Sequence, residues 1–78
     1  MSGAPRTVVV TGAASGFGRA VATKLCRDGN RVALLDVDGP GIDQLSAALG
    51  SNAIGRQCDV RSPVSVRDAV TAAADTFG

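Results

Sequence analysis

The sequence predicts an α/β fold in which three parallel strands alternate with three helices, in the order β-α-β-α-β-α. Short apolar runs rich in valine and leucine alternate with segments whose apolar residues recur every three to four positions. Glycines, or a serine–proline pair, mark the boundaries between these segments. Strands joined through helices are parallel, and such crossovers are right-handed. With 78 residues, the chain is at most one small domain.

The first strand and the first helix are predicted on either side of a glycine-rich stretch. Residues Arg6–Thr11 form a continuous β-branched run, which is typical of a strand buried on both faces. From Gly16 the spacing becomes helical, and Gly29 with Asn30 ends the helix. The predicted apolar face of this helix comprises Phe17, Val21 and Leu25, with Gly18, Ala22 and Cys26 on the adjacent row.

The rest of the chain repeats this alternation twice. Arg31–Asp36 is predicted as a second strand that closes on a carboxylate, and Ala53–Val60 as a weaker third strand. Ser62 and Pro63 open a last helix with a side-chain cap and a first-turn proline. The short helix between the second and third strands carries Ile42, Leu45 and Leu49 and stops at Gly50; the last helix carries Val66, Val70, Ala73 and Phe77.

Three such strands in the spatial order 3-2-1 make half of a doubly wound, Rossmann-type nucleotide-binding sheet. The chain ends before the fourth strand of such a sheet, so we expect residues 1–78 to be an incomplete domain. Ligands of these sheets bind at the carboxyl ends of the strands. Candidate functional residues are therefore expected in the loops that follow the three strands.

Composition excludes several classes of partner. Eight basic and seven acidic residues leave a net charge of +1, and two phenylalanines are the only aromatic residues, so nucleic acid is not an expected partner. Histidine is absent, and Cys26 and Cys58 lack metal-ligand spacing, so no metal site is expected and both thiols are predicted to be reduced. No apolar run is long enough to span a bilayer, and no leader precedes the first strand. We expect a cytoplasmic protein.

Three glycines follow the first strand in the pattern Gly-x-x-x-Gly-x-Gly, at Gly12, Gly16 and Gly18. A helix N-terminus presents free N–H groups and a partial positive charge, which favour a phosphate. Gly12 is expected to permit the tight turn, Gly16 the approach of a pyrophosphate, and Gly18 close packing of the helix on the sheet. A Walker loop is excluded because Arg19 follows Gly18 where a lysine would be required. The alternative is a tight turn that binds nothing.

Carboxylates close the second and third predicted strands. Asp36 lies about twenty residues beyond the last loop glycine, where an acidic residue is expected to bind the ribose hydroxyls of a dinucleotide. Asp59 could accept a hydrogen bond from an adenine amino group while Val60 covers the ring. The alternatives are a helix cap or loop charge at Asp36 and a plain strand-ending aspartate at Asp59. Asp38 is interpreted as a helix cap or loop charge of that ordinary kind.

The stretch Thr11–Gly18, TGAASGFG, resembles the cofactor-binding motif Thr-Gly-x-x-x-Gly-x-Gly of the short-chain dehydrogenase/reductase family. Asp36, the Cys58–Val60 tripeptide and the ending DTFG fall where that family has its further cofactor contacts and its approach to a fourth strand. Phe17 departs from the usual isoleucine or leucine. The resemblance implies NAD binding, with contacts at Gly12, Ser15, Gly16, Phe17 and Gly18, then Asp36 at the ribose and Asp59 and Val60 around adenine.

The resemblance also implies hydride transfer between the nicotinamide and a small alcohol or carbonyl substrate, in an enzyme that forms a homo-oligomer. The family's catalytic serine and its Tyr-x-x-x-Lys pair would fall beyond Gly78, so no catalytic residue is assigned here. Because a carboxylate at Asp36 would repel a 2′-phosphate, NAD(H) is expected to bind in preference to NADP(H). Two alternatives stay open: a stand-alone dinucleotide-binding module without chemistry, and an inert fragment that self-associates.

Overall fold

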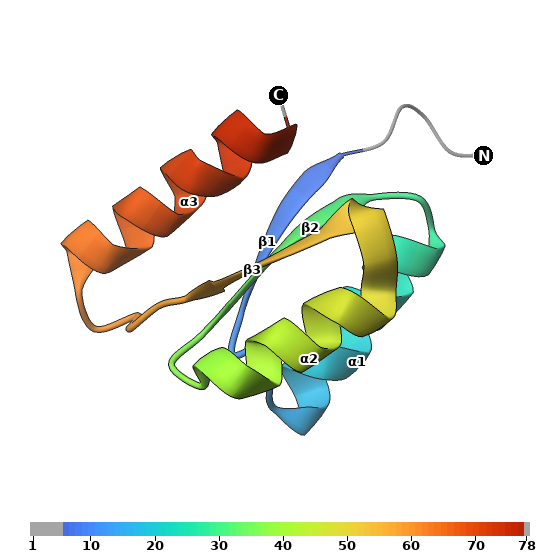
Figure 1. Cartoon of the computed structure of the whole chain (residues 1–78), viewed down its shortest axis with the longest axis horizontal. Coiled ribbons are helices and arrows are strands. Elements are labelled where there is room, and N and C mark those ends of the chain that lie inside the picture. Colours follow the sequence, from blue (N-terminus) through green and yellow to red (C-terminus); the bar gives the residue numbers. More distant parts are fainter. Residues whose placement is uncertain (1–5, 78) are drawn as a thin grey trace.

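A computed structural model describes residues 6–77 and contains the alternating elements that the sequence predicts (Figure 1). In chain order these are β1 (Thr7–Thr11), α1 (Gly16–Arg27), β2 (Arg31–Asp36), α2 (Gly39–Leu49), a short 3-10 helix η1 (Gly50–Asn52), β3 (Ala53–Gln57) and α3 (Pro63–Phe77). The strands form one parallel sheet in the order β1-β2-β3, which confirms the predicted 3-2-1 arrangement of a Rossmann-type half-sheet.

Strand β2 is the centre of the molecule, because it pairs with β1 on one side and with β3 on the other. Helices α1 and α2 cover one face of the sheet, and α3 lies across the opposite face (Figure 1). Val32, Ala33, Leu34 and Leu35 are therefore all fully buried, two on each face. This four-residue apolar run is the pattern expected of a strand covered on both sides.

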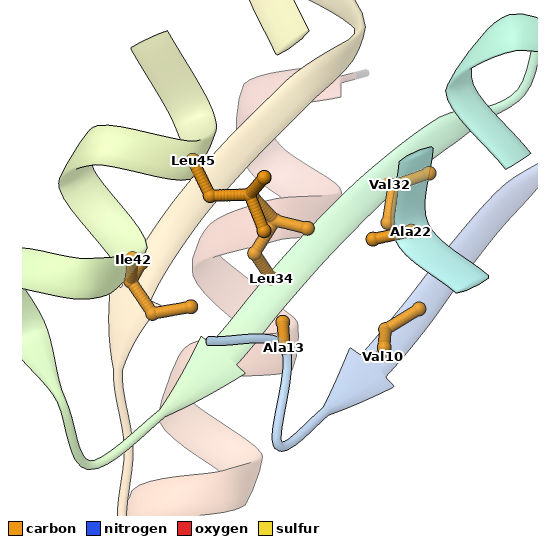
Figure 2. Packing of buried hydrophobic residues seen from close by; sticks show 7 residues of the cluster. All are labelled: Val10, Ala13, Ala22, Val32, Leu34, Ile42 and Leu45. Carbon is orange, nitrogen blue, oxygen red and sulfur yellow. The ribbon is translucent and has the colours of Figure 1, made fainter. Parts of the chain in front are cut away.

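The larger of the two cores lies between the sheet and helices α1 and α2. Figure 2 shows its members converging from β1, the following loop, α1, β2 and α2: Val10, Ala13, Ala22, Val32, Leu34, Ile42 and Leu45. Full burial of a side chain the size of Leu34 or Ile42 contributes about 1.5–3 kcal/mol. The smaller core on the α3 side comprises Leu35, Cys58 and Ala69, with Val66 packed against them.

Two boundary signals act as the sequence indicates. Gly29 has φ +91°, and Asn30 donates from its side-chain amide to the carbonyl of Leu25, so this pair closes the end of α1. Asp38 caps α2 through its carboxylate, which accepts a hydrogen bond from the N–H of Gly41 at 3.0 Å. The interpretation of Asp38 as an ordinary local charge is thus confirmed in the specific form of a helix cap.

The prediction that the first strand is buried on both faces is wrong. Only Val10 of β1 is buried, and Val9 is 39% exposed. The physical reason is position: β1 lies at the edge of the sheet formed by residues 6–77, and Val9 points to the face opposite the larger core that holds Val10. Its β-branched residues favour a strand in either setting, and the number of covered faces depends on neighbours that a local pattern does not reveal.

Three further boundaries and faces differ from prediction. Phe17 does not pack on the sheet: it is 84% exposed, and the buried row of α1 is Gly18 and Ala22. Strand β3 ends at Gln57 rather than Val60, although Cys58 still donates to the carbonyl of Asp36 at 2.8 Å. On α3 the buried residues are Ala69 and Ala73, while Val70 is 39% exposed. Alanine lets a helix approach the sheet closely, which rotates the buried face away from the larger valine.

Candidate functional site

The loops after β1, β2 and β3 meet at the carboxyl edge of the sheet, because the three strands are parallel and in register. This edge brings together the glycine loop, Asp36 and the turn that contains Asp59. The loop after β1 is attached to β2 directly, since the N–H of Ala13 donates to the carbonyl of Leu35 at 3.2 Å. Figure 2 shows Ala13 at this edge, beside the arrowheads of β1 and β2.

The glycine loop is a tight turn closed on the carbonyl of Gly12. Gly12 has φ +65°, a left-handed conformation that favours glycine. Its carbonyl accepts two hydrogen bonds from Ser15, one from the N–H at 3.1 Å and one from Oγ at 2.6 Å. A Cβ on Gly18 would collide with this same carbonyl and would lie 3.1 Å from the Cα of Ala13. Gly12 and Gly18 are thus required by the turn and by helix packing.

The N-terminus of α1 has no capping side chain. Ser15 occupies the N-cap position but makes no cap hydrogen bond; its hydroxyl is turned back onto the loop, where it donates to the carbonyl of Gly12. The first turn contains no acidic residue, and within residues 6–77 the N–H groups of Gly16, Phe17 and Gly18 have no acceptor. A Cβ on Gly16 would meet no atom within 4 Å. The result is an open, electropositive helix end suited to an anion.

Asp36 lies beside this helix end, and its carboxylate joins two loops. Oδ2 accepts a hydrogen bond from the N–H of Ala14 in the glycine loop, at 3.0 Å. Oδ1 accepts from the N–H of Asp38 in the loop before α2, also at 3.0 Å. A carboxylate has about four acceptor positions, so two remain for the hydroxyls of a ligand.

Asp59 forms an exposed ion pair with Arg61. Its Oδ1 accepts from the backbone N–H and from Nε of Arg61, at 2.9 and 3.1 Å, and Oδ2 accepts from Nη2 at 3.1 Å. The side-chain hydrogen bond from Arg61 is the main reason that the pKa of Asp59 lies below its ordinary value. The N–H of Asp59 donates to Ser65 Oγ on α3 at 3.3 Å, and Val60 is 56% exposed.

Two neighbours of the predicted site residues did not emerge from the sequence analysis. Ala14 binds Asp36 through its backbone, and no side-chain pattern could indicate that contact. Arg61 stands only two positions after Asp59, and a cation at that spacing is a signal that could have been used. Within residues 6–77, no group of three or more potential ligands could hold a metal ion, and no helix is long and apolar enough to cross a membrane.

The sheet, the crossover helices and the open helix end at the carboxyl edge define a Rossmann-type protein. The chain belongs to the short chain dehydrogenase family, whose sequence model matches residues 6–78. It is 40% identical over 76 residues to a D-threitol dehydrogenase from Mycolicibacterium smegmatis, an alignment that covers 94% of this chain and 29% of the relative. It is 39% identical over 70 residues to a cis-1,2-dihydrobenzene-1,2-diol dehydrogenase from Pseudomonas putida, covering 90% of this chain and 26% of that enzyme.

Solved structures of the same family superpose closely on this chain. A short-chain dehydrogenase/reductase from Burkholderia phymatum, in complex with NAD, gives a TM-score of 0.89 at 36% identity over 95% of this chain and 27% of that one. A 3-ketoacyl-(acyl-carrier-protein) reductase from Brucella melitensis, complexed with NADH, gives 0.87 at 31% identity over 95% of this chain and 30% of that one. The chain therefore spans less than a third of the length of these relatives.

Proposed function

We propose that residues 1–78 are the NAD-binding, amino-terminal portion of a short-chain oxidoreductase that acts on a small alcohol or carbonyl substrate. The observation that carries this proposal is the uncapped N-terminus of α1, framed by the glycine loop and flanked by Asp36. The two solved relatives bound to NAD or NADH support the choice of cofactor. When bound, the nicotinamide supplies hydride transfer.

The proposed contacts divide the dinucleotide among three segments. The proposed pyrophosphate site comprises Gly12 and Ser15 of the loop together with Gly16, Phe17 and Gly18, whose N–H groups have no acceptor within residues 6–77, and it uses the open space at Gly16. Asp36 would accept hydrogen bonds from the adenosine ribose through its two remaining acceptor positions.

The adenine subsite is proposed at Asp59 and Val60. Two bonds from Arg61 fill the acceptor positions of Asp59 Oδ1, whereas Oδ2 receives one bond and keeps a position for an adenine amino group. The exposed side chain of Val60 is available to cover the ring.

The proposal also covers the cellular location of the protein, its assembly and the place of its catalytic residues. Cys26 and Cys58 are free thiols, in keeping with a reducing cytoplasm. The resemblance to the family supports assembly as a homo-oligomer, and it assigns proton transfer to residues beyond Gly78. The part played by residues 1–78 is therefore binding and orientation of the cofactor.

The proposal is tested by titrating NAD and NADP into the protein by calorimetry. A carboxylate about 4 Å from a 2′-phosphate costs about 1 kcal/mol in water-like surroundings and about 4 kcal/mol at an effective dielectric constant of 20. We therefore expect NAD to bind more tightly by a factor between about 5 and about 1,000. Asp36→Ala should narrow the ratio, whereas Asp28→Ala, which removes an equal charge at the far end of α1, should leave it unchanged. Equal or tighter binding of NADP to the unsubstituted protein contradicts the proposed role of Asp36.

A further inference from the structure

The carboxylate of Asp36 is the only side chain in residues 6–77 that hydrogen-bonds the backbone of both the glycine loop and the loop before α2. One oxygen receives the N–H of Ala14, and the other receives the N–H of Asp38. Both donors are backbone groups, so the carboxylate determines where the two chain segments lie relative to each other. Hydrogen bonds to an ionised acceptor are stronger than those between neutral groups.

The glycine loop has three other attachments on this side. The N–H of Ala13 donates to the carbonyl of Leu35, and the methyl group of Ala13 is fully buried in the larger core. The methyl group of Ala14 lies close to Gly41 in the first turn of α2, where a Cβ on Gly41 would come within 3.2 Å of it. Asp36 adds a second hydrogen bond to these attachments, at Ala14, the residue directly before Ser15.

We propose that Asp36 is a positioning residue for the glycine loop in addition to its proposed role as a ribose ligand. This inference rests on the proposed function, because the loop is the proposed pyrophosphate site. The same carboxylate would then align the free N–H groups of α1 before any ligand arrives, and would leave two acceptor positions for the ribose. The ribose and pyrophosphate subsites are thereby coupled through one side chain.

A positioning role for Asp36 has a consequence in the ligand-free protein that a role as a ribose ligand alone does not have. If Asp36 only contacted ribose, its removal would change nothing in the ligand-free protein. If it positions the loop, its removal frees Ala14 and Asp38 while the sheet beneath them stays paired. Preorganisation of this kind lowers the ordering cost that a binding site must meet when its ligand arrives.

The test is amide hydrogen exchange, followed residue by residue by NMR in the ligand-free protein. In Asp36→Ala, exchange at Ala14 and Asp38 should accelerate about tenfold, the lower end of what a hydrogen bond to a charged group contributes. Exchange at Arg19, whose N–H donates to the carbonyl of Ser15, and at Leu34 in β2 should stay unchanged. Asp28→Asn, which breaks only the exposed pair with Lys24, is the matched control and should leave every one of these amides unaffected.

The exchange pattern in Asp36→Asn distinguishes the loss of a positioning hydrogen bond from a general loss of stability. Its side chain offers a single acceptor oxygen, so one of the two amides should keep its protection and the other should lose it. A merely structural loss of stability would accelerate all amides together, Leu34 included, and that result would overturn the proposal, as would unchanged exchange at Ala14 in both variants. If Asp36→Ala does not fold, the pattern in Asp36→Asn decides. Because no ligand is present, a failure of NAD binding leaves this result intact.

Discussion

Gly16 and Gly18 lie two residues apart in the first turn of α1, and the structure predicts opposite consequences for replacing each with alanine. A Cβ on Gly16 meets nothing within 4 Å, and its backbone is not left-handed. A Cβ on Gly18 collides with the carbonyl of Gly12, a backbone group that is already fixed by two hydrogen bonds from Ser15. One glycine therefore leaves space for a ligand, and the other brings the helix against the sheet.

The stability changes follow from these environments. Gly16→Ala should raise the free energy of unfolding by about 0.4–1 kcal/mol, because it reduces the conformational entropy of the unfolded chain without strain. Gly18→Ala forces the helix or the loop to move, and overpacking of this kind costs about 1–3 kcal/mol. Because the Cβ would meet a backbone carbonyl, the upper part of this range applies, about 2–3 kcal/mol; subtracting a gain in helix propensity of about 1 kcal/mol leaves an expected net loss of about 1–2 kcal/mol. For a domain of this size, each kcal/mol corresponds to a shift in Tm of about 4–8 °C.

Thermal unfolding followed by circular dichroism measures the two stabilities, and calorimetric titration with NAD measures the second consequence. Gly16→Ala should bind NAD about tenfold more weakly despite its greater stability, a loss of about 1.4 kcal/mol, because the methyl group occupies the approach of the pyrophosphate. Each variant is the control for the other. Undiminished NAD affinity in Gly16→Ala, or unchanged stability in Gly18→Ala, would refute this division of roles between the two glycines.

Three further outcomes are expected. Because Arg61 lowers the pKa of Asp59, the ion pair stabilises the fold above the ordinary pKa of aspartate, and this stability is lost as the pH falls through the lowered pKa. Arg61→Ala should raise the midpoint of the Asp59 titration measured by NMR, and an unmoved midpoint contradicts this cause of the shift. The 78-residue chain, which contains no tyrosine or histidine, should not reduce NAD with any alcohol, so NADH formation by the purified chain would overturn the prediction. The same chain should self-associate through the outer edge of β1, because the sequence TVVVT of Thr7–Thr11 is palindromic and places identical residues opposite each other in an antiparallel dimer. Val9→Lys should give a monomer in analytical sedimentation, and a monomeric unsubstituted chain refutes the edge pairing.

The sequence predicts the topology well because each element carries its own periodicity and its own end signal. Gly29 and Asp38, for example, act locally, so their roles as helix end and helix cap follow from their neighbours in the chain. The errors concern burial, which depends on distant segments. Phe17 occupies an apolar row of α1 and is exposed, because that row turns away from the sheet in the first turn. Val9 is partly exposed because it lies on the edge strand and points to the face opposite the larger core.

In the candidate site, too, the local features are predicted from the sequence and the contacts between distant segments are not. The glycine spacing predicts the loop because the left-handed turn at Gly12 and the close approach at Gly18 each require a particular residue type. The bond between Asp36 and Ala14 joins positions 22 residues apart through a backbone N–H, which every residue except proline provides. Only the parallel register of β1 and β2 brings these two groups together.

The N-termini of α1 and α2 lie at the same edge of the sheet but differ in how their N–H groups are hydrogen-bonded. In the first turn of α2, Gly39 donates to the carbonyl of Val37, Pro40 has no N–H to satisfy, and Gly41 donates to the carboxylate of Asp38. That helix end is complete without a ligand. At α1 the N–H groups of Gly16, Phe17 and Gly18 have no acceptor within residues 6–77, and the N-cap hydroxyl of Ser15 is turned toward the carbonyl of Gly12 rather than toward them. Since helix ends are ordinarily satisfied, an end left open beside a carboxylate with two unfilled acceptor positions supports the proposed anion site at α1 rather than at α2.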